Sequence, residues 1–350
     1  MRCARCPNVW RVRLSHSEIP PAASHTQARR DTSARRHRPA WIRLLGRFNR
    51  HDGPTWLVAL ALYGSWAALI AFHASIPWWL MAPAGGYLVA WHFSLQHEAI
   101  HSFRSAPQWL RWAVVMPPIG LWLPFPLYYA SHRQHHRNAQ LTEPGVDTES
   151  VYWHASAWNA LSPARRTILM ANQTLLGRVL IGPVLRLEKL VIRELERLQR
   201  KDFSHLPHWA LHAVLVALIF TYVSAICGMP WWQYLLLFAA PGFCFGWVRP
   251  FIEHRYGERP EARTAIIESN LFWSLLFLNN NYHAIHHRHP RIAWWRIPAY
   301  WRRHRERVLR DNGGFHFPGY AAVARQWLLH PVFKPVHPPS LDAVKRSDPA

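Results

Sequence analysis

The chain has 350 residues, half of them hydrophobic and 14% aromatic, including 21 tryptophans. Its 41 Lys and Arg against 19 Asp and Glu give a formal net charge of +22, which fits either a nucleic-acid-binding protein or a membrane protein with a basic cytoplasmic side. Four cysteines, two of them in a lone CxxC at Cys3 and Cys6, exclude a disulfide framework and supply no complete metal site.

Residues 1–52 contain twelve arginines and no lysine, with little hydrophobic periodicity. We interpret this segment as a disordered, solvated tail. It has neither interleaved aromatic residues nor a recognisable nucleic-acid-binding module, so we expect no nucleic-acid partner. It also lacks an apolar core, so no cleavable signal peptide is expected.

Four apolar runs follow, each near the lower length limit for crossing a hydrocarbon core. They cover Trp56–Phe72, Trp78–Phe93, Trp209–Cys227 and Trp231–Val248. The break inside each pair of runs holds no Lys or Arg, and the two breaks share a Pro-Trp-Trp sequence, at 77–79 and 230–232. The pattern predicts two helical hairpins whose turns lie outside the cell. Both termini and the long middle loop are then cytoplasmic.

Three further segments are predicted to lie on the cytoplasmic side. Leu110–Tyr129 is apolar but holds four prolines, which lipid-exposed helices do not tolerate well, so we place it at the membrane interface. Ala265–Leu278 is placed there too. Val184–Lys201 alternates charged residues with Leu and Val, as an amphipathic cytoplasmic helix does. The expected fold is therefore an all-α integral membrane protein, with four spans in two hairpins, interfacial helices and a cytoplasmic helical cap.

Three groups stand out among the 24 histidines. One is HxxxH and two are HxxHH, and on a helix the residues i, i+3 and i+4 lie on one side. Neutral imidazole is a good ligand for iron, zinc, copper and nickel. Two identical HxxHH groups on one side of the membrane predict a metal site. The three groups are His97 and His101; His132, His135 and His136; and His283, His286 and His287.

With these three boxes the sequence resembles the membrane fatty acid desaturase and hydroxylase superfamily, and within it the bacterial group that includes dihydrorhizobitoxine desaturase. The resemblance runs over residues 53–338, leaving 339–350 as a C-terminal tail. It includes the segments Leu141–Ser150 and Leu276–Asn281. It implies that all eight box histidines bind metal, and that His254, after the fourth run, is the ninth ligand.

The resemblance also implies a chemistry. Two iron ions would activate O2 to introduce a double bond into a fatty acyl chain or a similar lipid-like substrate at the membrane. A methylene hydroxylase or ketolase of the same superfamily is the nearest alternative. Electrons would come from a separate ferredoxin or cytochrome, and the bacterial inner membrane is the expected location. Residues expected to orient the ligating rings are Glu98, Asp147, Glu149, Glu253, Asn280 and Asn281.

Two readings from other functional classes stay open. His97-Glu98-Ala99-Ile100-His101 also matches the HExxH motif of zinc proteases, with Glu98 as the general base. An intramembrane protease would leave both HxxHH groups unused. A histidine-rich metal transporter is the other reading, although transport sites usually lie at the middle of the membrane.

Overall fold

A computed structural model describes residues 40–137 and 140–338 of the chain. The chain divides by its contacts between residues 47 and 48, and the second unit contains α3 and all the elements that follow it. Most of the Arg-rich segment, the Cys3–Cys6 pair and the tail 339–350 lie outside the described residues. The described end of the Arg-rich segment forms helix α2, Ala40–Arg50.

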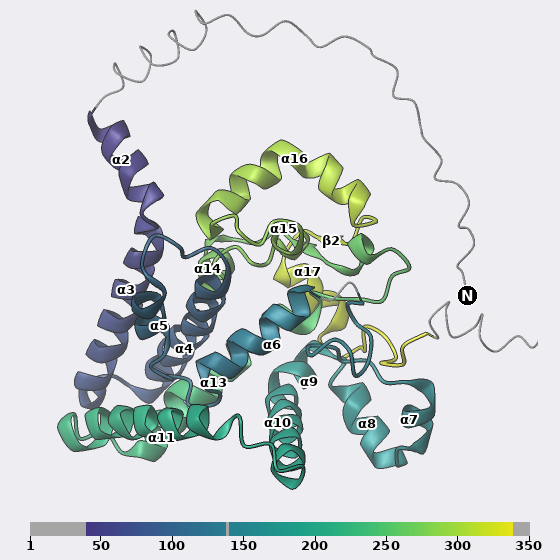
Figure 1. Ribbon diagram of the computed structural model, residues 1–350, viewed down its shortest axis with the longest axis horizontal. Helices are drawn as coiled ribbons and strands as arrows, with labels where there is room; N and C mark the ends of the chain where they lie inside the picture. Colours follow the sequence, from purple (N-terminus) through teal and green to yellow (C-terminus); the bar gives the residue numbers. More distant parts are fainter. Residues whose placement is uncertain (1–39, 138–139, 339–350) are drawn as a thin grey trace, which may run out of the picture. The chain divides into compact units, whose positions relative to one another are not determined.

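The described residues are mostly helical (Figure 1). After α2 come α3 (Gly53–Ala71), η1 (His73–Ser75), α4 (Trp78–His101), α5 (Gln108–Val115), α6 (Phe125–Arg137), α7 (Ala155–Ala160), α8 (Pro163–Ala171), α9 (Leu175–Leu180), α10 (Gly182–Gln199), α11 (Leu206–Phe220) and η2 (Thr221–Ile226). Then follow α12 (Trp231–Tyr234), η3 (Leu235–Ala239), α13 (Ala240–Val248), η4 (Arg249–Phe251), η5 (Pro260–Arg263), α14 (Leu271–Leu276), α15 (His283–Arg288), η6 (Trp294–Arg296), α16 (Ile297–Asp311) and α17 (Tyr320–Trp327).

A short parallel pair of strands departs from the expected all-helical fold. Strand β1 (Ile266–Ile267) pairs with β2 (His316–Phe317). Both β1 residues are buried, and the backbone N–H of Ile267 bonds to the carbonyl of Asn281. This pairing therefore fastens the segment before α15 to the C-terminal region.

Three helical segments of the described chain are long and apolar enough to cross a membrane: 53–71, 206–226 and 231–251. They contain three of the four expected spans, and they indicate a membrane protein. The fourth expected span lies in α4, which is 24 residues long. Helix α4 is not among the three, because its tryptophans, glycines, proline and histidines lower its mean hydropathy. A fourth span and the two-hairpin arrangement stay predictions.

Helix α4 packs closely against the segment formed by η3 and α13. A Cβ atom at Gly86 would lie 2.6 Å from the Cβ of Pro241, and one at Gly242 would lie 2.3 Å from a methyl carbon of Val89. Glycine at these two positions lets the helices approach more closely than any other residue would. The close packing brings the end of α4 next to the chain that follows α13.

The proline-rich segment between α4 and α6 does not form one helix. Helix α5 ends at Val115, and α6 begins at Phe125. Between them Ile119 is fully buried, and its carbonyl accepts a hydrogen bond of 2.7 Å from the hydroxyl of Tyr234. Gln96 donates to the carbonyl of Val115 over 3.0 Å. The segment thus folds back onto the helices, and α6 leads away from them. In Figure 1, α15 and α16 lie on one side of α6, with α10 and α11 on the other.

Candidate metal centre

Four parts of the chain, far apart in sequence, bring the nine predicted histidines together. Helix α4 ends with the first box, α6 carries the second, and α15 carries the third. His254 follows the apolar segment 231–251 and pairs with Thr264 in an isolated antiparallel bridge. All nine rings fall into two groups, in each of which the ligand atoms lie within 4.8 Å of one another.

The first cluster contains five histidines and the second contains four. The members of the first cluster are His97, His101, His132, His136 and His286. The members of the second cluster are His135, His254, His283 and His287. The clusters are adjacent, because the ring of His136 stacks on that of His287 with 4.3 Å between centroids.

The helical repeat explains how each HxxHH box serves both clusters. Residues i and i+4 differ by only about 40° around a helix, whereas i+3 and i+4 differ by about 100°. Accordingly His132 and His136 lie in the first cluster, and His135 lies in the second. In the third box the pair His283 and His287 lies in the second cluster, and His286 crosses into the first.

Two carboxylates hold the rings of the second box. The Nδ1–H of His135 donates to Asp147 over 2.7 Å, and the Nδ1–H of His132 donates to Glu149 over 2.8 Å. Asp147 also accepts the backbone N–H groups of Thr142, at 2.8 Å, and Glu149, at 2.9 Å. A carboxylate cannot donate, so both rings carry their proton on Nδ1 and direct a lone pair from Nε2 into the cluster.

The other four residues expected to orient the rings differ in their placement. Glu253 lies 3.3 Å from Nδ1 of His283, and the amide of Asn280 lies 3.4 Å from both His283 and His97. The side chain of Asn281 instead donates to the carbonyl of Ile267. The remaining residue, Glu98, lies 3.5 Å from the backbone N–H of Trp294. The structure therefore puts Glu98 and Asn281 in contacts that brace the backbone.

Burial and the repulsion between neighbouring histidines keep the rings of the third box in the neutral form that binds metal. Burial, followed by the repulsion of neighbouring histidines, lowers the pKa of His283, His286 and His287 well below its ordinary value, so the rings are neutral at pH 7. Burial also lowers the pKa of His135, but the charges of Glu149 and Asp147 outweigh it and raise that pKa. A more basic imidazole is a stronger metal ligand.

The polar atoms inside the clusters fit bound metal ions. The Nε2 atoms of His101, His132 and His135 are buried without a hydrogen-bond partner in the described part of the chain. The Nε2 atoms of His283 and His287 lie 3.0 Å apart, as do those of His286 and His136. Two nitrogens bound at right angles to one ion, each at roughly 2.1 Å, would be about 3 Å apart. Buried, unpaired lone pairs at this spacing are costly unless a cation satisfies them.

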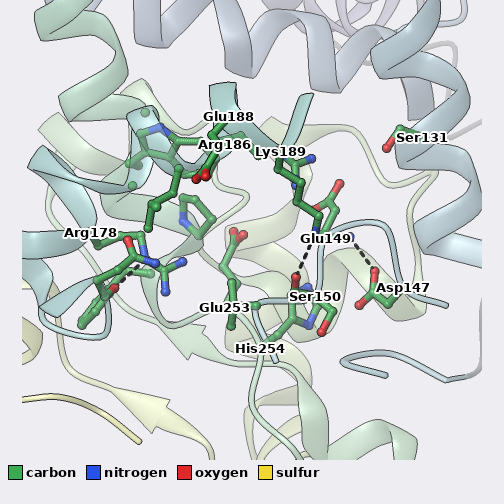
Figure 2. A pocket seen from close by; sticks show the side chains of 18 of the residues that line it. Ser131, Asp147, Glu149, Ser150, Arg178, Arg186, Glu188, Lys189, Glu253 and His254 are labelled. Carbon is green, nitrogen blue, oxygen red and sulfur yellow. Dashed lines mark hydrogen bonds between the residues drawn. The ribbon is translucent and has the colours of Figure 1, made fainter. Parts of the chain in front are cut away.

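A cavity of about 530 Å³ lies against the clusters, with Asp147, Glu149, Glu253 and His254 in its wall (Figure 2). Sequence reasoning did not single out Arg249, which lines this cavity and forms an ion pair of 2.6 Å with Glu253. The i, i+4 spacing of these two residues was the available signal. A smaller cavity of about 40 Å³ reaches His97 and shares the wall residues Phe93, Tyr128, Gly246 and Arg249 with the larger one.

Comparisons with known proteins bear on the family of this chain. A search of curated proteins gives no match. The sequence model of the fatty acid desaturase family matches residues 74–319, more than half of the chain. That stretch contains all three histidine boxes and His254. The chain therefore belongs to the fatty acid desaturase family.

Proposed function

We propose that this chain, an oxidoreductase by its membership of the family, is a di-iron, O2-dependent desaturase. It would introduce a double bond into a fatty acyl chain or a similar lipid-like substrate. The single observation that carries the proposal is the gathering of nine histidines into two adjacent clusters of five and four. An all-nitrogen ligand set of this size is compatible with two iron ions that keep positions open.

The clusters would hold one ion each. The first cluster would bind it through His97, His101, His132, His136 and His286, and the second through His135, His254, His283 and His287. When bound, the iron pair supplies the activation of O2 and the removal of hydrogen from an unactivated methylene. Everything else is the work of the protein.

Each supporting residue has a defined task. Asp147 and Glu149 accept the Nδ1 protons of His135 and His132, which keeps both Nε2 lone pairs directed at the metals. Glu253 holds His283 in the same way and is itself held by Arg249. The apolar rings of Phe93, Trp122 and Phe243 line the larger cavity and would exclude water from an acyl chain lying there.

Two observations favour an oxygenase over the HExxH protease. The first cluster adds His132, His136 and His286 to the two histidines of the motif, which exceeds the ligand set of a protease zinc. The carboxylate of Glu98 contacts the backbone N–H of Trp294 at 3.5 Å, whereas the general base of a protease would have to reach a metal-bound water. A transporter is disfavoured because the eight box histidines lie at the end of α4 and on α6 and α15, whereas transport sites usually lie at the middle of the membrane. Hydroxylation or ketolation by the same apparatus stays the nearest alternative.

We further propose the finer assignments. Segment Leu141–Ser150, which resembles the group that includes dihydrorhizobitoxine desaturase, supplies Asp147 and Glu149, so we place the chain with that group. We propose four spans in two hairpins, with α4 as the second span, in a bacterial inner membrane and with the clusters in the cytoplasm. Electrons would come from a separate ferredoxin or cytochrome that approaches the basic cytoplasmic side of the protein.

Metal and product analysis of the same preparation tests the proposal. Detergent-purified protein should contain two irons per chain, and the lipids of an expressing strain should gain unsaturated acyl chains by mass spectrometry. New oxygenated products without new double bonds would indicate the hydroxylase instead. A single zinc per chain would contradict the oxygenase. His330→Ala, an exposed histidine outside both clusters, is the matched control and should change neither result.

A further inference from the structure

The wall of the larger cavity carries a group of basic side chains. Arg178 belongs to α9, and Arg186, Lys189 and Arg193 belong to α10. Figure 2 shows Arg178 on one side of the cavity and Asp147 and Glu149 on the other, with Glu253 between them. The acids are already engaged with histidines or, for Glu253, also with Arg249.

Three of these cations form no ion pair at contact distance, although the charges of Glu149 and Asp147 act on Arg186 from farther away. In the described part of the chain, no carboxylate oxygen lies within 4.0 Å of the charged groups of Arg178, Arg186 or Lys189. Their hydrogen bonds go to neutral oxygens: Arg186 to the carbonyl of Thr148 at 3.3 Å, and Lys189 to that of Ser150 at 3.4 Å. Arg178 is buried, and Arg186 and Lys189 are half-buried. A buried cation without an ion pair is costly, so an anion that enters the cavity beside these groups would be stabilised.

One of these cations is deeply buried, and another is electrostatically crowded. Arg178 is only 4% exposed and donates to the carbonyl of Asn172 and the side chain of Gln173. Burial, and then the charges of Arg186 and Arg193, lowers the pKa of Lys189 to about 8. Like charges brought this close in a cavity attract an external anion.

The anion would lie beside the metal clusters. Thr148 and Ser150, which receive the bonds from Arg186 and Lys189, flank Glu149, and Glu149 accepts the proton of His132. On the other side of the shared wall, the smaller cavity reaches His97 past Ala90 and Phe277. The apolar part of a molecule whose anionic end lies at α10 would instead contact Phe93, Trp122 and Phe243 in the wall of the larger cavity.

The outer face of α10 indicates where such a molecule comes from. Along this face the side chains of Val184, Leu187, Val191, Leu195 and Leu198 are between 41% and 65% exposed. Their spacing of three and four residues makes one apolar stripe. Three of the cavity-lining cations, Arg186, Lys189 and Arg193, lie on other positions of the same helix. A helix with this distribution lies in the surface of a membrane, where amphiphiles are concentrated.

We propose that this cavity binds the anionic head group of an amphiphilic substrate, with Arg178, Arg186 and Lys189 as the anion site. The inference rests on the proposed function for the reaction that follows, but not for binding. It narrows the substrate to a lipid that carries a carboxylate or phosphate and disfavours a neutral lipid. The charge, and not the length of the chain, would supply the discrimination.

The site is tested by isothermal titration calorimetry, in which amphiphilic probes are titrated into the full-length, iron-loaded protein in neutral detergent. The probes are dodecanoate, dodecyl phosphate, dodecanol and dodecyltrimethylammonium, which share one chain and differ in head group. We expect at least one anion to bind tenfold or more tightly than dodecanol, and the cation to bind most weakly. The preferred anion identifies the head group. Equal affinity for dodecanol and both anions would overturn the proposal.

Variants on α10 separate the anion site from a merely structural role. The double variant Arg186→Gln/Lys189→Gln should lose at least tenfold in anion affinity, while Arg186→Lys/Lys189→Arg should retain it. Arg200→Gln removes an exposed arginine of the segment just after α10 and should leave affinity unchanged. Unaltered anion binding in the glutamine double variant would refute the site. The same titration on metal-free protein tests binding even if the chain holds no iron.

Discussion

Replacement of Asp147 by asparagine tests whether a hydrogen bond to His135 controls the metal centre. Asp147 is 3% exposed and accepts three hydrogen bonds, from His135, Thr142 and the backbone of Glu149. Asparagine has nearly the same shape but only one acceptor oxygen. Whichever way its amide is turned, at least one donor loses its partner: Thr142 in one orientation, and both His135 and the backbone N–H of Glu149 in the other.

The size of the effect follows from these contacts. If the amide N–H₂ faces Thr142, a buried backbone N–H is left unpaired, which costs about 1–3 kcal/mol. If it faces His135, the ring must accept at Nδ1 and carry its proton on Nε2, which cannot then bind metal. Loss of such a supporting group commonly lowers metal affinity or activity by about 10- to 100-fold. That range corresponds to about 1.4–2.7 kcal/mol, in agreement with the structural figure.

Iron competition provides the assay. Purified Asp147→Asn protein should lose half of its iron at a 10- to 100-fold lower chelator concentration than the parent, with a fall in product formation. Asp202→Asn makes the same chemical change at a surface aspartate paired with Arg197, and it should behave as the parent does. Parental iron affinity in a folded Asp147→Asn protein would refute the role assigned to this hydrogen bond.

Three further predictions follow from the packing and the charges. His286→Ala removes the one first-cluster ligand that α15 supplies. Iron content should fall by at least half and activity should be lost, while the protein still inserts into the membrane. Full iron content in this variant would show that His286 is not a metal ligand. Gly242→Ala should lower the thermal unfolding temperature, because its methyl group would overlap Val89 at a cost of about 1–3 kcal/mol. Gly64→Ala is the control, because a methyl group there has open space and should leave the unfolding temperature unchanged. Equal unfolding temperatures of the two variants would contradict the packing argument. Lys189, whose charged neighbours are Arg186, Arg193 and Asp147, loses its charge above about pH 8, so anion affinity should decline as the pH rises through that value. Lys189→Arg should abolish this pH dependence of anion affinity. A pH dependence that persists in the arginine variant would show that Lys189 does not cause it.

Some features of the fold follow from local sequence patterns, and others depend on contacts between distant segments. Predominant helix, the membrane character and the family were predictable, because apolar runs and histidine spacing are local properties of the chain. By composition alone, α4 does not qualify as a membrane span. Its polar and small residues lower its mean hydropathy, and yet Gly85 and Gly86 are there because η3 and α13 pack against them. The pairing of β1 with β2 was also missed, since two-residue strands joined across 50 residues have no local signal.

The residues that orient the histidine rings also show what position in the sequence does not reveal. Glu98 and Asn281 are next to box histidines in sequence, but their hydrogen bonds go to backbone elsewhere. Asp147 and Glu149 lie more than ten residues from the rings that they contact, and only the return of the loop after α6 brings them there. Proximity along the chain is therefore a weak guide to which carboxylate reaches an imidazole.

The sequence by itself determined which histidines belong together on each helix, because an HxxHH spacing sets their angles about the helix axis before any tertiary contact forms. The tertiary structure alone decided how these histidines divide into five and four, since that depends on how α4, α6 and α15 cross. It also decided that the cations of α9 and α10 share a cavity with the clusters, because residues brought together across the folded chain have no spacing in the sequence to reveal them.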